Sequence, residues 1–227
     1  MITIKKGCFN YQTTPILNNI SLTIQPNTIT ALIGPNGSGK STLLKCLALP
    51  NYKMTGDITL NKIPLATLDR TKEIAWMSSH LEVTSLFSGV EIVMLGQREE
   101  NKDEAIKWLE WCGCGEEMYR PYPHCSAGQQ QKIQLARTIA QETPVLLLDE
   151  PFTHMDLKYQ NLITSKLKNW AKDTHKCLVI ASHNLDNIEK CCDHAILIKR
   201  GEIKKQGSLK ECFTSADLSD LFETHVH

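Results

Sequence analysis

The chain has 227 residues, which is enough for one large domain or two small ones built around a substantial core. Lysine plus arginine and aspartate plus glutamate number 25 each, so no bulk charge suggests nucleic acid as a partner. No segment approaches the roughly 18 continuous apolar residues of a transmembrane helix, so any association with a membrane would come through a partner.

Nine cysteines at irregular spacing predict free thiols in a reducing cytoplasm rather than a disulfide framework. Cys112-Gly113-Cys114 and the pair Cys191-Cys192 are candidate metal ligands, but neither has a second pair at zinc spacing. We therefore expect the cysteines to be small buried apolar residues.

Strands are predicted early in the chain, at residues 2–5, 16–17, 20–24 and 56–61, separated by asparagine-rich and proline turns. We expect them to form an antiparallel layer beside a nucleotide site. Residues 29–33 are apolar and rich in β-branched side chains and predict a buried strand, whereas residues 43–49 predict a helix.

Between that buried strand and that helix lies Gly34-Pro35-Asn36-Gly37-Ser38-Gly39-Lys40-Ser41-Thr42, which has the spacing of a phosphate-binding loop. Its glycines allow the backbone N–H groups, together with the helix N-terminus, to face a phosphate. Lys40 would add a mobile charge for the β- and γ-phosphates, and the hydroxyl of Ser41 would bind Mg²⁺. The alternative is a glycine-rich turn that matches by chance, but the flanking strand and helix favour nucleotide binding.

The middle of the chain predicts a change of architecture. A strand at residues 73–77 leads into a loop at 78–80, and the following stretch shows helical periodicity, with helices expected at 90–95, 104–112 and 126–141. Because no strand pattern interrupts it, we interpret residues 81–140 as a helical insertion into an α/β core.

The last third returns to continuous apolar strands, at residues 145–150 and 177–181, separated by a helix at 158–172. Strands of this composition are typical of parallel sheets covered on both faces. A closing hairpin is expected from residues 194–199 and 202–206. We expect one domain over residues 1–227.

Two carboxylates follow the strand at residues 145–150. Asp149 would hold Mg²⁺, and Glu150 beside it would polarise the water that attacks the γ-phosphate. The alternative is an acidic turn that caps a helix. The phosphate loop in the same chain favours the nucleotide site over this alternative. The expected fold class is α/β, a phosphate-loop NTPase core with a mixed sheet, an antiparallel β layer and a helical subdomain insertion.

At this point the sequence resembles the ATP-binding subunits of ABC transporters over nearly its whole length. The resemblance rests on five motifs in order: Gly34–Thr42 as Walker A, Ser126-Ala127-Gly128-Gln129 as the signature, Val145–Glu150 as Walker B, Thr153-His154-Met155-Asp156 as the D-loop, and Ser182-His183 as the switch histidine. Tyr11 occupies the position of the aromatic residue that stacks on adenine in this family.

The resemblance implies ATP and Mg²⁺ as cofactors and hydrolysis of ATP with Glu150 and His183. It also implies a head-to-tail homodimer, in which Ser126, Gly128 and Gln129 complete the nucleotide site of the opposite subunit. Polytopic permease subunits would be the membrane partners, with this chain peripheral at the cytoplasmic face of the inner membrane and with no nucleic acid bound.

Three positions depart from the family pattern. Cys125 and Ala127 replace the leucine and first glycine of the signature, and the loop after residues 74–77 has Ser79 and His80 where a glutamine is usual. Ala127 adds one methyl group, so we expect phosphate contact to survive. Ser79 leaves one Mg²⁺ ligand unassigned, with His80 as the competing candidate.

The segments at 86–90, 95–98 and 207–222 are similar to importer ATPases for iron–siderophore, haem and vitamin B12, and we favour import of such a metal chelate. Residues 126–131 and 149–153 are instead similar to the ATPase of the haem exporter used in cytochrome c maturation. A soluble ABC ATPase with a regulatory rather than a transport role is the third hypothesis.

Overall fold

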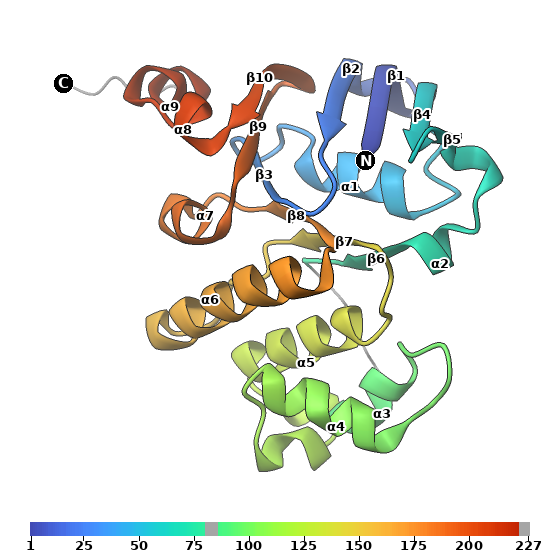
Figure 1. The fold of residues 1–227 in the computed structure, drawn as a ribbon, viewed down its shortest axis with the longest axis vertical. Helices are drawn as coiled ribbons and strands as arrows, with labels where there is room; N and C mark the ends of the chain where they lie inside the picture. Colours follow the sequence, from blue (N-terminus) through green and yellow to red (C-terminus); the bar gives the residue numbers. More distant parts are fainter. Residues whose placement is uncertain (80–85, 223–227) are drawn as a thin grey trace.

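The computed structural model describes residues 1–79 and 86–222, which contain two sheets. The smaller sheet is antiparallel, with the order β2 (Thr14–Ile24), β1 (Ile2–Tyr11), β4 (Thr55–Leu60) and β5 (Ile63–Pro64). It is the antiparallel layer that the sequence predicts. In Figure 1 it lies at the opposite end of the molecule from the helices α3, α4 and α5.

The larger sheet has six strands in the order β10 (Glu202–Ser208), β9 (His194–Lys199), β3 (Ile29–Ile33), β8 (Cys177–Ala181), β7 (Val145–Asp149) and β6 (Ile74–Met77). Five strands are parallel and β10 pairs antiparallel with β9 at one edge, so the sheet is mixed. The carboxyl ends of β3, β7 and β8 therefore meet at one edge of the sheet, where open α/β sheets bind ligands.

Each central strand divides its side chains between two hydrophobic cores. Leu146 and Leu148 pack into the core that the helices cover, whereas Val145 and Leu147 pack into the core beneath the antiparallel sheet. The alternation follows from the period of two in a strand, and burial on both faces explains why these strands are continuously apolar.

The described residues form nine α-helices, of which the last two follow the last strand. The nine helices are α1 (Lys40–Ala48), α2 (Arg70–Glu73), α3 (Gly89–Met94), α4 (Lys102–Trp111), α5 (Ala127–Ile139), α6 (Leu157–Thr174), α7 (Leu185–Cys191), α8 (Leu209–Cys212) and α9 (Ser215–Phe222). Between β6 and β7 the described residues form helices and one isolated bridge, Ser88 to Pro121. No described helix is long and apolar enough to cross a bilayer.

Two expectations about the first sheet are wrong. The segments at 16–17 and 20–24 belong to one strand, β2, and β1 continues to Tyr11 instead of ending at residue 5. Lys6 and Asn19 have φ of 52° and 48°, and the β1–β2 ladder absorbs them as register shifts without ending either strand. Irregular residues that look like turn signals therefore lie inside the strands.

Three of the four tryptophans form one cluster between α4 and α6. The ring centroids of Trp108, Trp111 and Trp170 lie 6.1 to 6.4 Å apart, with interplanar angles of 60° to 84°. The fourth, Trp76, lies in β6. All nine cysteines are free thiols, and all except Cys8 are buried, which confirms the expectation for those eight.

Candidate active site

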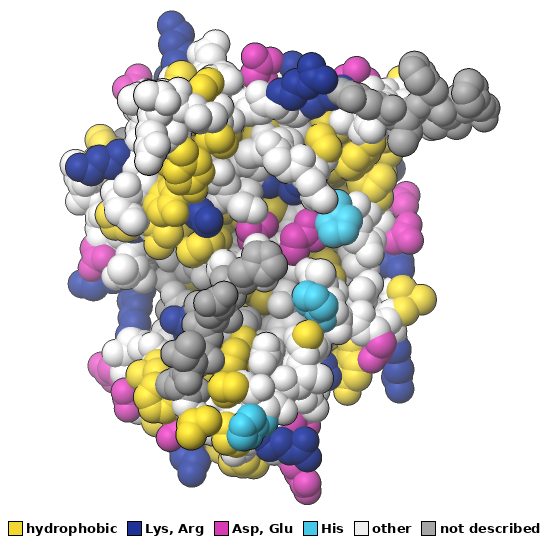
Figure 2. Space-filling view, turned by 180° about the vertical axis from the view of Figure 1, so that it is seen from behind, with side chains coloured by type: hydrophobic (Ala, Val, Ile, Leu, Met, Phe, Trp, Pro, Cys, Tyr) yellow, Lys and Arg dark blue, Asp and Glu magenta, His cyan; other side chains and the backbone are white. Residues whose placement is uncertain are grey.

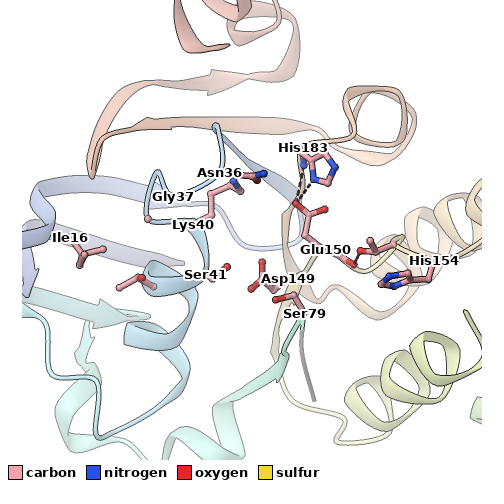
Figure 3. Close-up of a pocket in the computed structure, with 13 residues that line it drawn as sticks. Ile16, Asn36, Gly37, Lys40, Ser41, Ser79, Asp149, Glu150, His154 and His183 are labelled. Atoms are coloured by element: carbon pink, nitrogen blue, oxygen red, sulfur yellow. Dashed lines mark hydrogen bonds and ion pairs between the residues drawn. The ribbon is translucent and has the colours of Figure 1, made fainter. Parts of the chain in front are cut away.

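A cavity of about 440 Å³ opens at the carboxyl edge of the six-stranded sheet. In the space-filling view, acidic, basic and histidine side chains gather around a hollow in the middle of this face (Figure 2). Figure 3 shows the phosphate loop on one side and the side chains that follow β7 and β8 on the other. The lining residues are Ile16, Asn36, Gly37, Gly39, Lys40, Ser41, Thr42, Ser79, Asp149, Glu150, Thr153, His154 and His183.

The loop from residue 34 to residue 42 has a backbone that requires glycine at several points. A Cβ on Gly34 would lie 2.1 Å from the carbonyl oxygen of Ile198 in β9. Gly37 and Gly39 have φ of 75° and 105°, which side chains disfavour. Gly39 is also the N-cap of α1 and provides no side-chain cap, so the first turn of the helix is open toward the cavity.

Lys40 provides the positive charge of the loop. Its side chain is buried, and Nζ donates hydrogen bonds to the carbonyl oxygens of Gly34 at 2.7 Å and Pro35 at 3.0 Å. Burial lowers the pKa of the Lys40 ammonium, opposed by the charges of Glu150 and Asp149. A phosphate oxygen would offer this ammonium a charged acceptor in place of two neutral carbonyls, so the loop suits an anion.

Asp149 ends β7 with an unsatisfied carboxylate oxygen. The residue is 1% exposed, and its Oδ1 has no hydrogen-bond partner among the described residues. Burial raises the pKa of the Asp149 carboxyl, while hydrogen bonding from the hydroxyls of Ser41 and Ser79 opposes the rise. A buried carboxylate beside two hydroxyls is a set of hard oxygen donors that suits Mg²⁺. The residues present therefore fit the metal that the sequence predicts.

Glu150 and His183 face each other directly, as the dashed lines in Figure 3 show. Oε1 of Glu150 lies 2.8 Å from Nδ1 of His183 and accepts a hydrogen bond from the His183 backbone N–H at 3.1 Å. Its Oε2 accepts a hydrogen bond from the hydroxyl of Ser182 at 3.0 Å. The carboxylate is thus held at the cavity wall by groups that follow β8, and it can accept a proton from a water in the cavity.

The backbone of Glu150 is also held on both sides. Its N–H donates to the carbonyl oxygen of Ala181, and its own carbonyl oxygen accepts from the Thr153 hydroxyl at 2.6 Å and from Nε2 of Gln131 at 2.8 Å. The sequence assigns no individual role to Gln131, the fifth residue of α5, because its contact with Glu150 depends on tertiary packing.

The signature residues lie elsewhere. Ser126 is the N-cap of α5 and forms a capping box with Gln129, whose side chain accepts from the Ser126 backbone N–H at 2.8 Å. None of Ser126, Gly128 and Gln129 lines the cavity of its own chain. A Cβ on Gly128 would lie 2.6 Å from the carbonyl oxygen of His154, so this glycine allows the first turn of α5 to approach the segment after β7.

Tyr11 belongs to an aromatic group with Phe9 and Tyr52, with ring centroids 5.0 to 6.0 Å apart. Burial and hydrogen bonding to Tyr52 raise the pKa of its phenol to about 12, while a hydrogen bond with Thr42 of the phosphate loop opposes the rise. Tyr11 is 42% exposed but does not line the cavity. Ile16, which sequence reasoning also misses, is the residue of β2 that lines the cavity.

Ser79 lines the cavity with Asp149, as expected for the loop after β6. His80, the competing candidate, lies outside the described residues. Gly34, Pro35 and Ser38 belong to the loop without lining the cavity, and Ser38 is buried with no partner for its hydroxyl among the described residues.

Comparison with known proteins gives a consistent result. Residues 17–153 match the family model described as ABC transporter. The chain is 32% identical to the hemin import ATP-binding protein of Shewanella denitrificans, over 98% of this chain and 93% of that protein. It is also 32% identical to the iron(3+)-hydroxamate import ATP-binding protein of Bacillus subtilis, over 92% of this chain and 82% of that one.

Solved structures show the same fold. A dimeric bacterial ABC transporter cassette superposes with a TM-score of 0.84 at 26% identity, covering 92% of this chain and 99% of that chain. A metal-chelate type ABC transporter in an inward-facing conformation gives a TM-score of 0.81 at 24% identity, covering 98% and 88% respectively.

Proposed function

The chain belongs to the ABC transporter family of ATPases, and from that premise we propose that it powers the import of an iron–siderophore, haem or cobalamin-type metal chelate through a membrane permease. The observation that carries the proposal is the cavity in which the phosphate loop faces the Glu150–His183 pair. The curated relatives that act in hemin and iron-hydroxamate import support the class of cargo.

ATP binding in this proposal uses the loop amides and the Lys40 ammonium for the phosphates, and the exposed Tyr11 for the base. Ser41 and Asp149 would hold Mg²⁺, which would neutralise charge on the β- and γ-phosphates. The buried, unpartnered Oδ1 of Asp149 supports this assignment.

Hydrolysis needs a base for the attacking water, and we assign this role to Glu150. Its carboxylate accepts the proton, while His183 and Ser182 hold its two oxygens in place. Retention of both Glu150 and His183 at one cavity favours turnover over a regulatory module that binds ATP without hydrolysing it.

The two-subunit arrangement is also a proposal. Ser126 is exposed at the N-terminus of a 13-residue helix, where the helix dipole attracts a phosphate, yet it lies outside its own chain's cavity. A head-to-tail dimer brings Ser126, Gly128 and Gln129 of one chain to the nucleotide of the other. The dimeric cassette of similar fold supports dimer formation in general.

We place the permease contact at a groove of about 390 Å³ beside α3, lined by Leu86, Ser88, Val90, Glu91, Met94, Lys102, Tyr119 and Pro121. Leu86 and Tyr119 are 71% and 56% exposed and line the same groove, and exposed apolar side chains that gather at one place mark an interaction site. An amphipathic helical segment of the polytopic partner is the occupant that this mixture of apolar walls and charged rim suits. The chain would then lie at the cytoplasmic face of the inner membrane as a peripheral subunit.

Uptake by cells tests the cargo. Deleting the gene should abolish uptake of one among radiolabelled ferric siderophore, haemin and vitamin B12, and a plasmid copy should restore it. Unchanged uptake of all three would overturn the import of this class of cargo. Loss of haem delivery to cytochrome c with normal uptake would instead favour the exporter hypothesis.

Leu86→Asp tests the partner. It should abolish that uptake and co-purification with the permease, because a charge replaces apolar contact in the groove, while ATP hydrolysis by the purified chain stays unchanged. Ile63→Asp is the control, since Ile63 is 48% exposed on the antiparallel sheet, away from the groove. Normal uptake by the Leu86 variant would exclude this groove as the contact.

Ser79→Gln tests the loop after β6. Serine is shorter than glutamine by two heavy-atom bonds, so we expect the native chain to have weak basal turnover, and the longer amide should raise it several-fold by reaching the metal. If His80 has taken the role instead, His80→Ala should lower turnover and Ser79→Gln should do little. Steady-state phosphate release across a Mg²⁺ titration distinguishes the two. No effect from either substitution would remove this loop from the reaction, even though Ser79 lines the cavity.

A further inference from the structure

Glu150 adopts a backbone conformation that its own side chain disfavours. Its φ is 51°, in the left-handed region, immediately after the last residue of β7. This conformation turns the chain away from the strand direction, and the carboxylate then points at Ser182 and His183. A non-glycine residue stays in this region when its surroundings hold it there.

Three donors hold the carbonyl oxygen of Glu150. The hydroxyl and the backbone N–H of Thr153 donate from within the same turn, so these bonds move with the turn. Gln131 donates from α5 through Nε2 at 2.8 Å, and its side chain is 8% exposed, so water competes little for the bond. Gln131 therefore links this turn to α5, a helix of 13 residues.

A second contact joins the same two segments. The first turn of α5 approaches the carbonyl oxygen of His154 so closely that residue 128 has no room for a Cβ. The turn from residue 150 to residue 154 thus packs on the N-terminal part of α5 at two points, Gly128 and Gln131. These two contacts link the position of α5 to the backbone of Glu150.

We propose that Gln131 is a positioning residue for ATP hydrolysis, which fixes the Glu150 carboxylate and couples it to the helix that bears Ser126. The inference rests on the role proposed for Glu150. In the proposed dimer, a nucleotide of the opposite subunit binds at the N-terminus of α5, and Gln131 lies little more than one helical turn farther along. Binding of a nucleotide at one site would in this way change the position of the Glu150 carboxylate at the other site.

Gln131→Met tests the inference, because methionine has similar length and no N–H donor. We expect kcat for ATP hydrolysis to fall about tenfold or more, since a displaced base loses its alignment. The KM for ATP and the ATP-induced rise in melting temperature should stay within about twofold, because the phosphate loop is untouched. An unchanged kcat would overturn the inference.

Gln134→Met is the matched control. Gln134 lies on the same helix and is 6% exposed, and its Nε2 donates to the hydroxyl of Tyr122 at 2.8 Å, away from Glu150. It should lower the melting temperature without changing kcat by more than about twofold. An equal loss of kcat in both variants would reduce Gln131 to a purely structural role and overturn the proposal.

A double variant separates positioning from general damage. In a Glu150→Gln background, Gln131→Met should cause no further loss of turnover, because the base on which Gln131 acts is already absent. A further tenfold loss would contradict the inference. If Gln131→Met does not fold, Gln131→Glu keeps the side-chain size, replaces the donor with an acceptor, and should show the same selective loss of kcat.

Failure of the proposed function and failure of the positioning role give different results. Absence of phosphate release by the native chain with Mg-ATP would refute ATP hydrolysis itself. Release by the native chain that Glu150→Gln abolishes and Gln131→Met leaves intact would refute the positioning role alone.

Discussion

Lys40→Ala is expected to weaken ATP binding about a hundredfold, because it removes the ammonium that would face the phosphates. A hydrogen bond to a charged group contributes about 3 kcal/mol at most, or roughly a hundredfold in Kd. With ATP at about 100 times the native Kd, the nucleotide stabilises the native chain by about 2.7 kcal/mol, but a variant with a hundredfold higher Kd gains only about 0.4 kcal/mol. Thermal melting with and without ATP measures the difference.

The control must also lose a buried lysine, and Lys132→Ala provides it. Lys132 is 7% exposed, like Lys40, but its ammonium donates to the carbonyl oxygen of Gly113 and lies 3.4 Å from the ring centroid of Tyr159. This variant should melt at a lower temperature and keep the full ATP-induced shift. An undiminished shift in the Lys40 variant would remove the phosphate loop from the nucleotide site.

Glu150→Gln is expected to lower ATP turnover about a thousandfold while leaving ATP binding intact. Glutamine keeps the shape of the side chain, and the Ser182 hydroxyl, which now donates to Oε2, can accept from the new amide instead. What is lost is the ability to take a proton from water. Phosphate release measures the turnover, and melting with Mg-ATP measures the binding.

The same variant should accumulate as an ATP-bound dimer in size-exclusion chromatography with Mg-ATP, since ATP would persist in the interface. Native chain under the same conditions and Glu189→Gln, an exposed carboxylate on α7, are the controls. Turnover close to that of the native chain would contradict the role of Glu150. A monomer at high protein and ATP concentration would contradict the two-subunit arrangement.

The parallel core and the nucleotide loop are the parts that sequence alone predicts best. Continuous apolar strands covered on both faces leave few alternatives, and the glycines around Lys40 are required by backbone geometry at Gly34, Gly37 and Gly39. These features are local, so a sequence pattern carries them. The α/β fold class and the mixed sheet are confirmed.

Short helices and long-range contacts are harder to predict. Four short helices, α2, α7, α8 and α9, are not predicted from the sequence, because four to eight residues carry little periodicity. Asn184 caps α7, and Ser208 with Glu211 forms a capping box at α8. The bond from Gln131 to the Glu150 carbonyl depends on how α5 packs against the turn after β7, and no local sequence pattern predicts that packing.

The tryptophan cluster between α4 and α6 has a practical consequence. Because Trp108 and Trp111 belong to α4 while Trp170 belongs to α6, the native ultraviolet emission of this chain arises largely at one boundary. A rotation of α4 against α6 changes the separations and mutual angles of these rings, and with them the energy exchanged between neighbouring indoles. The tryptophan fluorescence of the unlabelled chain therefore reports motion between these two helices, and Trp76 in β6 contributes a background signal.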